Sequence, residues 1–219
     1  MKDISKIIIV DDHELFREGI KLLIEAEGLG TVIGEAKNGE EFLVLLKYLN
    51  PDLVLMDIEM PVMGGVEATR KAIEMKPDLR VLVLTMLNDN ATYDDMFDAG
   101  ALGFVLKTAG KQELERAIRT MNEGESFFSK ELKEQIVLQG KRKKIDLHEV
   151  VKQIKLSPRD REVLQLFCQG LTNDEISSAL FISNKTVEYY RKRLQEKTNT
   201  KNAIHLLLFA IRHGLVRID

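Results

Sequence analysis

The sequence predicts two folded parts: an α/β domain built on a doubly wound parallel sheet, and a smaller all-α domain after it. In the first part, short apolar runs alternate five times with stretches of helical periodicity, the pattern of parallel strands joined by helices. In the last third of the chain the strand-like runs end and only helix signals remain. A length of 219 residues suits two modest domains.

The five predicted strands are short and almost entirely apolar, as expected for strands buried on both faces of a sheet. They are Ile7–Val10, Val32–Ala36, Leu53–Met56, Val81–Leu84 and Leu102–Leu106. The predicted helices run through Leu15–Ile24, from Asn38 to Leu49, and through Val66–Met75, Ala91–Asp98 and Glu113–Met121. Asn38 and Glu41 have the spacing of a capping box. Five such units in sequence imply a doubly wound parallel sheet, for which we expect the strand order 2-1-3-4-5.

Composition and charge exclude several classes of protein. Cys168 is the single cysteine, which rules out an internal disulfide, and no apolar stretch is long enough to span a membrane. The start of the chain does not resemble a signal peptide, so we expect a cytoplasmic protein. Residues 1–122 hold 14 Lys+Arg against 22 Asp+Glu, a net charge of −8, whereas residues 155–219 hold 11 against 7, a net of +4. This asymmetry favours nucleic-acid contact in the second part.

Polar side chains close four of the five predicted strands at the same edge of the sheet. Asp11 and Asp12 follow the first strand, Asp57 the third, Thr85 the fourth and Lys107 the fifth. In an open parallel sheet this edge forms the ligand-binding crevice. Three clustered carboxylates favour a divalent cation, most naturally Mg²⁺. A carboxylate nucleophile beside a lysine and a hydroxyl can then accept a phosphoryl group.

The sequence around these residues resembles the receiver domain of two-component response regulators. The resemblance covers residues 1 to about 125 and rests on Val10-Asp11-Asp12-His13, Leu55-Met56-Asp57-Ile58-Glu59-Met60-Pro61, Thr85 and Gly103-Phe104-Val105-Leu106-Lys107. It implies a flavodoxin-like fold whose Asp57 is the phosphoacceptor for a sensor histidine kinase.

The same resemblance implies roles for the other residues of the crevice. Mg²⁺ would be held by Asp11, Asp12, Asp57 and the backbone carbonyl of Glu59. Thr85 and Lys107 would sense the phosphoryl group, and Phe104 would be an aromatic switch residue.

The rest of the chain divides into a linker and a second domain. We predict a receiver over residues 1–125, a partly helical linker over 126–154 and a helical second domain over 155–219. The linker contains the basic run Gly140–Lys144, which is typical of a solvated segment.

The second domain contains the signals of four helices. Ser157-Pro158 is an N-cap followed by proline at the first helical position, and Thr172 with Glu175 forms a capping box for the next helix. Ser183–Thr186 opens a third helix that runs to about Lys197, and an apolar helix ends the domain. Two short helices joined by a tight turn suit a helix-turn-helix.

This second domain resembles the LuxR-type DNA-binding domain. The residues that carry the resemblance are Leu156-Ser157-Pro158-Arg159, Glu162-Val163-Leu164, Gln169 to Ile176, Phe181 to Val187 and Lys201-Asn202-Ala203. With the receiver, they make the whole chain resemble a NarL/FixJ-type transcriptional regulator, which implies double-stranded DNA as a partner and a homodimer when phosphorylated. The resemblance implies DNA contacts through Lys185, Thr186, Glu188, Tyr189 and Lys192.

Glu188 and Tyr190 depart from this family, whose members usually have Lys and His there. Glu188 would repel phosphate, can accept a hydrogen bond from a cytosine amine, and can also pair with Lys185 or Lys192. Two functions stay open, a phosphorylation-dependent transcription regulator and a regulator that acts mainly through protein–protein contacts with altered or lost DNA binding. A phosphatase or phosphotransferase would need a leaving-group acid or a substrate lid, and neither motif is visible, so we do not expect an enzyme.

Overall fold

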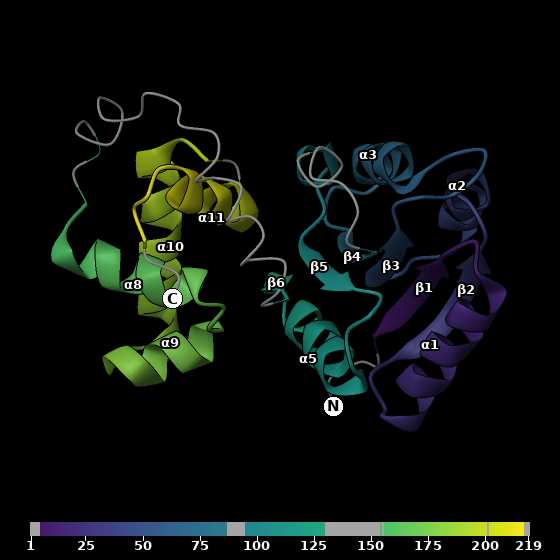
Figure 1. Cartoon of the computed structure of the whole chain (residues 1–219), viewed down its shortest axis with the longest axis horizontal. Coiled ribbons are helices and arrows are strands. Elements are labelled where there is room, and N and C mark those ends of the chain that lie inside the picture. The colour runs from purple at the N-terminus through teal and green to yellow at the C-terminus, as the bar shows by residue number, and fades with distance from the viewer. Residues whose placement is uncertain (1–4, 87–94, 130–153, 155, 201, 217–219) are drawn as a thin grey trace. The chain divides into compact units, whose positions relative to one another are not determined.

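The chain folds into two compact units, Met1–Phe128 and Ser129–Asp219. The computed structural model describes residues 5–86, 95–129, 154, 156–200 and 202–216. Figure 1 shows a layered α/β unit and a helical unit, and each is described by itself. The helices predicted for the linker lie outside the described residues. No helix in the described part of the chain is both long and apolar enough to cross a membrane.

A parallel sheet of six strands forms the centre of the N-terminal unit, in the order β2-β1-β3-β4-β5-β6. The strands are β1 Lys6–Val10, β2 Thr31–Ala36, β3 Leu53–Asp57, β4 Arg80–Thr85, β5 Gly103–Leu106 and β6 Phe127–Phe128. Every pair of neighbours is parallel. This confirms the predicted α/β class and the order of the five predicted strands. All residues of β3 are buried, as its apolar run indicated.

The sixth strand was not predicted from the sequence. It contains only Phe127 and Phe128, which is too short to give a periodic pattern. Phe127 pairs with Gly103 and Phe128 with Phe104 on the neighbouring β5. Both strand residues are buried, so the burial of two aromatic side chains at the sheet edge accounts for this strand.

Helices cover both faces of the sheet. In Figure 1, α1 Glu14–Ala26 and α5 Lys111–Asn122 lie on one face, and α2 Gly39–Tyr48 and α3 Gly65–Met75 on the other. The core under the first pair includes five buried helix residues, Ile20, Ile24, Ala117, Ile118 and Met121. Of the helix predicted over Ala91–Asp98, residues 95–98 are helical and the others lie outside the described residues.

Helix α2 begins as predicted, but half of its capping box is wrong. Asn38 Oδ1 accepts a hydrogen bond from the Glu41 backbone N–H at 2.9 Å, as the spacing predicted. The Glu41 carboxylate accepts its backbone hydrogen bond from Lys37, not from Asn38. Because the Lys37 ammonium also lies 3.3 Å from the Glu41 carboxylate, this ion pair favours a hydrogen bond from the Lys37 backbone N–H over one from the Asn38 backbone N–H.

Gly65, the first residue of α3, packs directly against the end of β3. Its backbone N–H donates to the Ile58 carbonyl at 2.8 Å. A Cβ at this position would lie 2.1 Å from the Asp57 carbonyl oxygen, whereas one at Gly64 would lie 3.2 Å from its nearest neighbour. Gly65 is therefore required by a close backbone approach.

Four helices make up the described core of the C-terminal unit: α8 Pro158–Cys168, α9 Asn173–Leu180, α10 Asn184–Thr198 and α11 Ala203–Arg212. Both predicted helix starts are confirmed, because Ser157 caps α8 with Pro158 at its first position and Thr172 forms a reciprocal capping box with Glu175. Phe181 ends α9 in the left-handed conformation, and Ser183, two residues later, is the N-cap of α10. The α9–turn–α10 segment is the predicted helix-turn-helix.

Polar contacts fix α10 on both of its partner helices. Arg191 donates to the Asn173 side-chain oxygen of α9 at 2.6 Å, and its guanidinium lies 4.6 Å from the centroid of the Phe167 ring of α8. Near the other end of α10, Lys197 Nζ lies 2.7 Å from Asp160 Oδ2 in the first turn of α8. These contacts orient α10 so that one face packs inward and the other faces solvent.

Candidate functional site

The polar ends of the strands meet in one pocket at the carboxyl edge of the sheet. Asp57 ends β3, Thr85 ends β4, and Lys107 directly follows β5. The pocket is lined by His13, Asp57, Ile58, Glu59, Thr85, Met86 and Lys107. Asp11 follows β1 and is fully buried beside this pocket, and Asp12 is exposed. The structure thus brings together the residues that the sequence placed at this edge.

Lys107 bridges two buried carboxylates. Its Nζ lies 2.7 Å from Asp11 Oδ2 and 2.7 Å from Asp57 Oδ2, and only 8% of its side chain is exposed. Burial by itself would lower the Lys107 pKa, but the hydrogen bonds and attraction of Asp11 and Asp57 outweigh burial and raise that pKa. Lys107 is therefore a fixed positive charge at neutral pH.

Asp57 is held in place, but its negative charge is disfavoured. Burial raises the pKa of the Asp57 carboxyl, the hydrogen bond from Lys107 opposes this, and the charge of Asp11 adds to it. Asp57 Oδ1 also accepts a hydrogen bond from the Ile58 backbone N–H at 2.8 Å. An additional cation in the pocket would offset the unfavourable charge.

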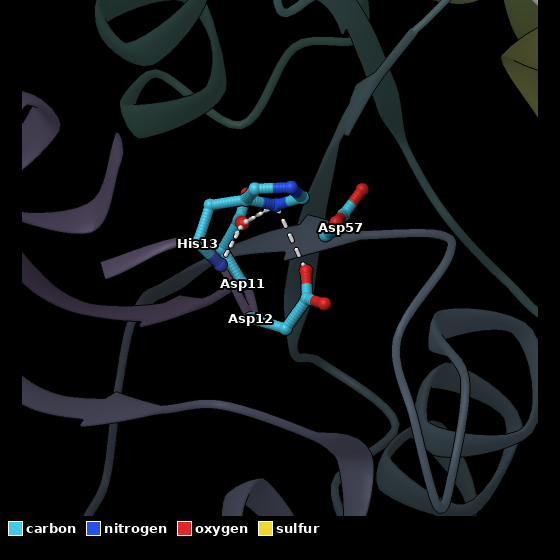
Figure 2. A group of neighbouring side chains, drawn as sticks. All are labelled: Asp11, Asp12, His13 and Asp57. Carbon is cyan, nitrogen blue, oxygen red and sulfur yellow. Dashed lines mark hydrogen bonds and ion pairs between the residues drawn. The ribbon is translucent and has the colours of Figure 1, made fainter. Parts of the chain in front are cut away.

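Asp12 and His13 approach Asp11 and Asp57 from the loop after β1, as Figure 2 shows. His13 Nδ1 lies 2.9 Å from Asp12 Oδ1 and 3.1 Å from Asp11 Oδ1. One possible ligand atom from each of the four residues lies within 4.8 Å of the others. The group is therefore compact enough for one ion to contact all four side chains after small adjustments.

The donor set fits a divalent cation. Three carboxylates and the Lys107 ammonium leave two negative charges, which one divalent ion would balance. Asp11 Oδ2 is buried, and it lies 2.7 Å from the Lys107 ammonium. Carboxylate oxygens are the preferred ligands of Mg²⁺. Asp11, Asp12 and Asp57 would supply them.

Two further predicted pocket residues are present, each with its own contacts. The Thr85 hydroxyl donates to the Met86 carbonyl at 3.0 Å, so it must rotate before it can bond a phosphoryl oxygen. Glu59 lines the pocket, and the carbonyl of the preceding Ile58 accepts the N–H of Gly65. That hydrogen bond fixes the backbone next to the predicted carbonyl ligand of Glu59.

Phe104 lies on β5 and is fully buried. Its ring centroid is 4.3 Å from that of Phe97 and 6.2 Å from that of Phe128, which it stacks against with an interplanar angle of 14°. Phe97 and Phe128 are also in ring contact, at 6.1 Å. The predicted switch residue is thus part of a three-ring cluster defined by Phe97, Phe104 and Phe128.

The predicted DNA-contacting residues lie toward the solvent side of α10. Four of them are exposed, namely Lys185, Glu188, Tyr189 and Lys192. Thr186 is half-buried, and its hydroxyl is hydrogen-bonded to Ser183 Oγ at 2.8 Å in the N-cap of the helix. Thr186 therefore already has a structural role.

Glu188 has no ion-pair partner among the described residues, so the pairing with Lys185 or Lys192 that the sequence left open is not formed. Tyr189 is 61% exposed and packs edge-on against Tyr190 at 5.7 Å. An exposed acid, an aromatic ring and two lysines, which form no ion pair with other described residues, remain for a partner surface.

Three residues that line the pocket were missed as site residues, namely His13, Ile58 and Met86. His13 directly follows the acid pair, and this position in the chain was a signal that could have identified it. Met86 follows Thr85 and is 53% exposed at the pocket. An exposed methionine after a strand carries no comparable signal, because its chemistry does not suggest a ligand or a charge.

Comparison with known proteins agrees with this geometry. Residues 7–119 match the model of the response regulator receiver domain, and residues 155–210 match that of bacterial regulatory proteins of the luxR family. These two matches define the class of protein, in which a phosphoacceptor-type receiver is joined to a LuxR-type helix-turn-helix domain.

Relatives share this architecture over nearly the whole chain. The response regulator GacA of Pseudomonas aeruginosa is 37% identical over 212 residues, which cover 96% of this chain and 97% of the relative. The response regulator UvrY of Escherichia coli strain K12 is 35% identical over 214 residues, 97% of this chain and 96% of the relative. The solved complex of the two-component response regulator RcsB with DNA is 28% identical, with a TM-score of 0.58 over 94% of this chain and 98% of that one. The chain belongs to the NarL/FixJ-type response regulators, which are two-component transcription regulators.

Proposed function

We propose that this regulator accepts a phosphoryl group from a sensor histidine kinase on Asp57, and that this modification switches its dimerisation and sequence-specific DNA binding. One observation carries the proposal: the Asp57 carboxylate lies in an open pocket, 2.7 Å from a fixed lysine and within reach of two further acids. Burial raises the pKa of Asp57, and a carboxylate of higher pKa is the better nucleophile.

The transfer exchanges one bond to phosphorus for another. An Asp57 oxygen attacks the phosphorus of a phosphohistidine, and the phosphorus–nitrogen bond breaks with its electron pair remaining on the kinase imidazole. Lys107 balances the negative charge that arrives on Asp57. Mg²⁺ bound to Asp11, Asp12, Asp57 and the Glu59 backbone carbonyl would neutralise and orient the phosphoryl oxygens.

The response to phosphorylation begins at Thr85 and Phe104. The Thr85 hydroxyl exchanges the Met86 carbonyl for a phosphoryl oxygen, and Phe104 repacks in the space that this movement changes. The altered receiver surface then favours a homodimer, whose two α10 helices read two half-sites related by a twofold axis. Because its target is double-stranded DNA, we place its action in the cytoplasm.

The test of the chemistry is the intact mass of the full chain after incubation with acetyl phosphate and Mg²⁺. We expect one phosphoryl adduct on the wild type that hydroxylamine removes, as an acyl phosphate requires, and none on Asp57→Asn. An adduct that persists on Asp57→Asn would place the phosphoacceptor elsewhere. If neither protein gains an adduct from acetyl phosphate, and the wild type gains none from a panel of phosphorylated histidine kinases, the proposed phosphorylation of Asp57 is contradicted.

A second candidate function is regulation through protein contacts with altered or lost DNA binding. It is favoured by Glu188, an exposed acid that forms no ion pair within the described residues and lies on the helix that would meet the phosphate backbone. Selection of duplexes from a random DNA pool by the phosphorylated protein separates the two functions. Enrichment of a paired half-site supports DNA reading, whereas a pool that stays random supports the protein-contact function.

A further inference from the structure

We propose that Arg17 is a positioning residue of this pocket: it fixes the peptide unit between Asp11 and Asp12, and so sets how the two acids face the pocket. The inference rests on the proposed function, because it concerns the acids that would hold Mg²⁺ for phosphorylation of Asp57. Arg17 is not itself proposed as a ligand, and it acts only through the backbone.

The carbonyl of Asp11 is the group that Arg17 contacts. Arg17 Nη1 donates to this carbonyl oxygen at 2.7 Å, a short hydrogen bond from a charged donor. The carbonyl belongs to the planar peptide unit that joins Asp11 to Asp12, so its direction sets the orientation of one acid relative to the other. The Asp11 backbone N–H donates to the carbonyl of Ala36, the last residue of β2, at 3.0 Å. Both backbone groups of Asp11 are therefore fixed, one by the sheet and the other by Arg17.

The place of Arg17 in α1 explains how its side chain reaches that carbonyl. Arg17 is the fourth residue of the helix, and helical side chains lean toward the N-terminal end, which here is the loop that carries the acid pair. Only 15% of the Arg17 side chain is exposed. Glu35 of β2 lies beside it, with Oε2 3.7 Å from Arg17 Nε, and Glu35 Oε1 also lies 2.8 Å from the Lys21 ammonium.

An arginine at this position has two costs. A cation in the first turns of a helix is disfavoured by the helix dipole. Arg17 Nε is also buried without a hydrogen-bond partner in the described part of the chain, since Glu35 at 3.7 Å is too far away to accept one. An uncharged helix former would avoid both costs. The short hydrogen bond to the Asp11 carbonyl is the contact that offsets them, which is why we assign Arg17 to the pocket.

Three roles for Arg17 predict different effects of its removal on Mg²⁺ affinity. If Arg17 acted through its charge, it would repel a divalent ion, so its removal would strengthen binding. If it only stabilised the fold, its removal would lower the unfolding midpoint and leave the affinity of the folded protein unchanged. If it positions the two acids, its removal weakens binding.

The experiment measures Mg²⁺ affinity by calorimetry on the full chain, and the rate of phosphorylation by acetyl phosphate as a function of Mg²⁺ concentration. Arg17→Met keeps an unbranched helix former but has neither charge nor donor. We expect it to lower Mg²⁺ affinity by about tenfold and to raise the half-saturating Mg²⁺ concentration by the same factor. The rate at saturating Mg²⁺ should stay within about twofold of the wild type, because Asp57 and Lys107 are unchanged.

Two further variants separate the hydrogen bond from the charge and from Glu35. Arg17→Lys should recover part of the lost affinity, since its ammonium still donates but the side chain is shorter and lacks the guanidinium fork. Lys21→Met is the matched control, because it removes the other cation at Glu35 without contacting Asp11. We expect it to change Mg²⁺ affinity by less than about twofold.

Affinities that fall in the order wild type, Arg17→Lys, Arg17→Met support the proposal. Tighter binding by Arg17→Met, or unchanged binding with a lower unfolding midpoint, overturns it, and so does an equal loss in Lys21→Met. If Arg17→Met does not fold, Arg17→Lys decides alone, and wild-type affinity in that variant overturns the proposal. In all these cases a phosphoryl adduct on Asp57 of the wild type leaves the proposed function intact. A wild type that binds no Mg²⁺ contradicts both the proposed ion site and this inference.

Discussion

Asp57 carries a negative charge where the pocket disfavours it. Burial raises its pKa above the ordinary 3.8, and the neighbouring Asp11 adds to the shift while Lys107 opposes it. The folded N-terminal unit therefore binds this proton more tightly than the unfolded chain does. Near pH 7, the ionised carboxylate lowers the free energy of unfolding. The carboxylate proposed as the phosphoacceptor thus reduces stability.

We expect Asp57→Asn to stabilise the N-terminal unit at pH 7 without divalent ions, by on the order of 1 kcal/mol or about 4 °C in the unfolding midpoint. The gain should shrink as the pH falls through the raised pKa, since the wild type then takes up the proton itself. Calorimetry at pH 7 and pH 5 measures both effects. The exposed Asp78→Asn is the matched control and should change the midpoint by less than about 1 °C. A loss of stability in Asp57→Asn would mean that pairing with Lys107 outweighs burial.

Asp160 shows the opposite balance in the C-terminal unit. Its burial would raise its pKa, but hydrogen bonds from Lys197 and from Ser157 outweigh burial, and the pKa is lowered. The stability from this lowered pKa is therefore present above about pH 3.8, the ordinary value, and is lost as the pH falls through the lowered pKa.

We expect Asp160→Asn to destabilise the C-terminal unit by about 2 kcal/mol at pH 7, because it leaves Lys197 without its buried partner. The difference from the wild type should begin to narrow below the ordinary pKa of 3.8, where the unfolded chain takes up the proton, and should be lost once the pH has fallen through the lowered pKa of the folded protein. Denaturant unfolding at pH 7 and over a pH series below 3.8 measures it. Glu162→Gln, which breaks only the exposed contact with Arg159, should cost less than about 0.5 kcal/mol.

The sequence predicts the location of single site residues better than it predicts their environment. Asp11, Asp57, Thr85 and Lys107 could be placed in one pocket, because each follows a strand whose end the apolar pattern marks. The environment of Asp57 could not be predicted, because its burial and its distance to Lys107 depend on packing between elements far apart in the chain. The predicted hydrogen-bond donor to the Glu41 carboxylate was wrong for a similar reason. The ion pair between Lys37 and Glu41 favours the Lys37 backbone N–H over that of Asn38.

The start of α3 is the element that tolerates the least change. A Cβ on Gly65 would overlap the Asp57 carbonyl, and backbone atoms cannot move aside cheaply. We expect Gly65→Ala to cost about 2–4 kcal/mol in the free energy of unfolding of the N-terminal unit and to slow phosphorylation of Asp57. Gly64→Ala is the matched control and should change stability by less than about 1 kcal/mol, since Gly64 has a φ of −76° and more room. Equal effects of the two substitutions would contradict a specific close approach at Gly65.

Helix α10 allows a prediction about phosphate contact. Lys192 is exposed and, within the described part of the chain, has no ion-pair partner, so its charge is free to meet DNA. We expect Lys192→Ala to lower affinity for all duplexes by about three- to tenfold and to reduce the salt slope of binding by about 1. Fluorescence anisotropy of labelled duplexes at several salt concentrations measures both quantities. Lys71→Ala, on α3 of the other unit, should change neither.

Elements were predicted well where local signals mark both their ends. Helix α9 lies between its capping box and a turn, and its bounds follow from those signals. Strand β6 was missed, because two residues cannot show a period and its pairing partner lies 24 residues earlier, at Phe104 for Phe128. Such an element exists through tertiary burial and not through local propensity.

The whole molecule joins a pocket in one unit to a recognition helix in the other, and its central prediction concerns their coupling. We expect acetyl phosphate with Mg²⁺ to shift the full chain toward a dimer in analytical ultracentrifugation and to raise affinity for a paired half-site by at least about tenfold. Asp57→Asn should show neither change under the same conditions. An unmodified protein that already binds DNA with full affinity would contradict control by phosphorylation.

The three-ring cluster has a consequence for how a structural change at the pocket reaches the end of the N-terminal unit. Phe104 stacks on Phe128, which is the last residue of the N-terminal unit, so the proposed switch residue touches the point where the chain exits. In a tightly packed interior, one ring of such a group cannot turn unless its neighbours give way. Phe104, the proposed switch residue, and Phe128, at the end of the N-terminal unit, would then move together. We therefore expect Phe128→Ala, which removes the ring where the chain leaves the unit, to be phosphorylated normally on Asp57. Its dimerisation and its DNA affinity should no longer respond to that phosphorylation.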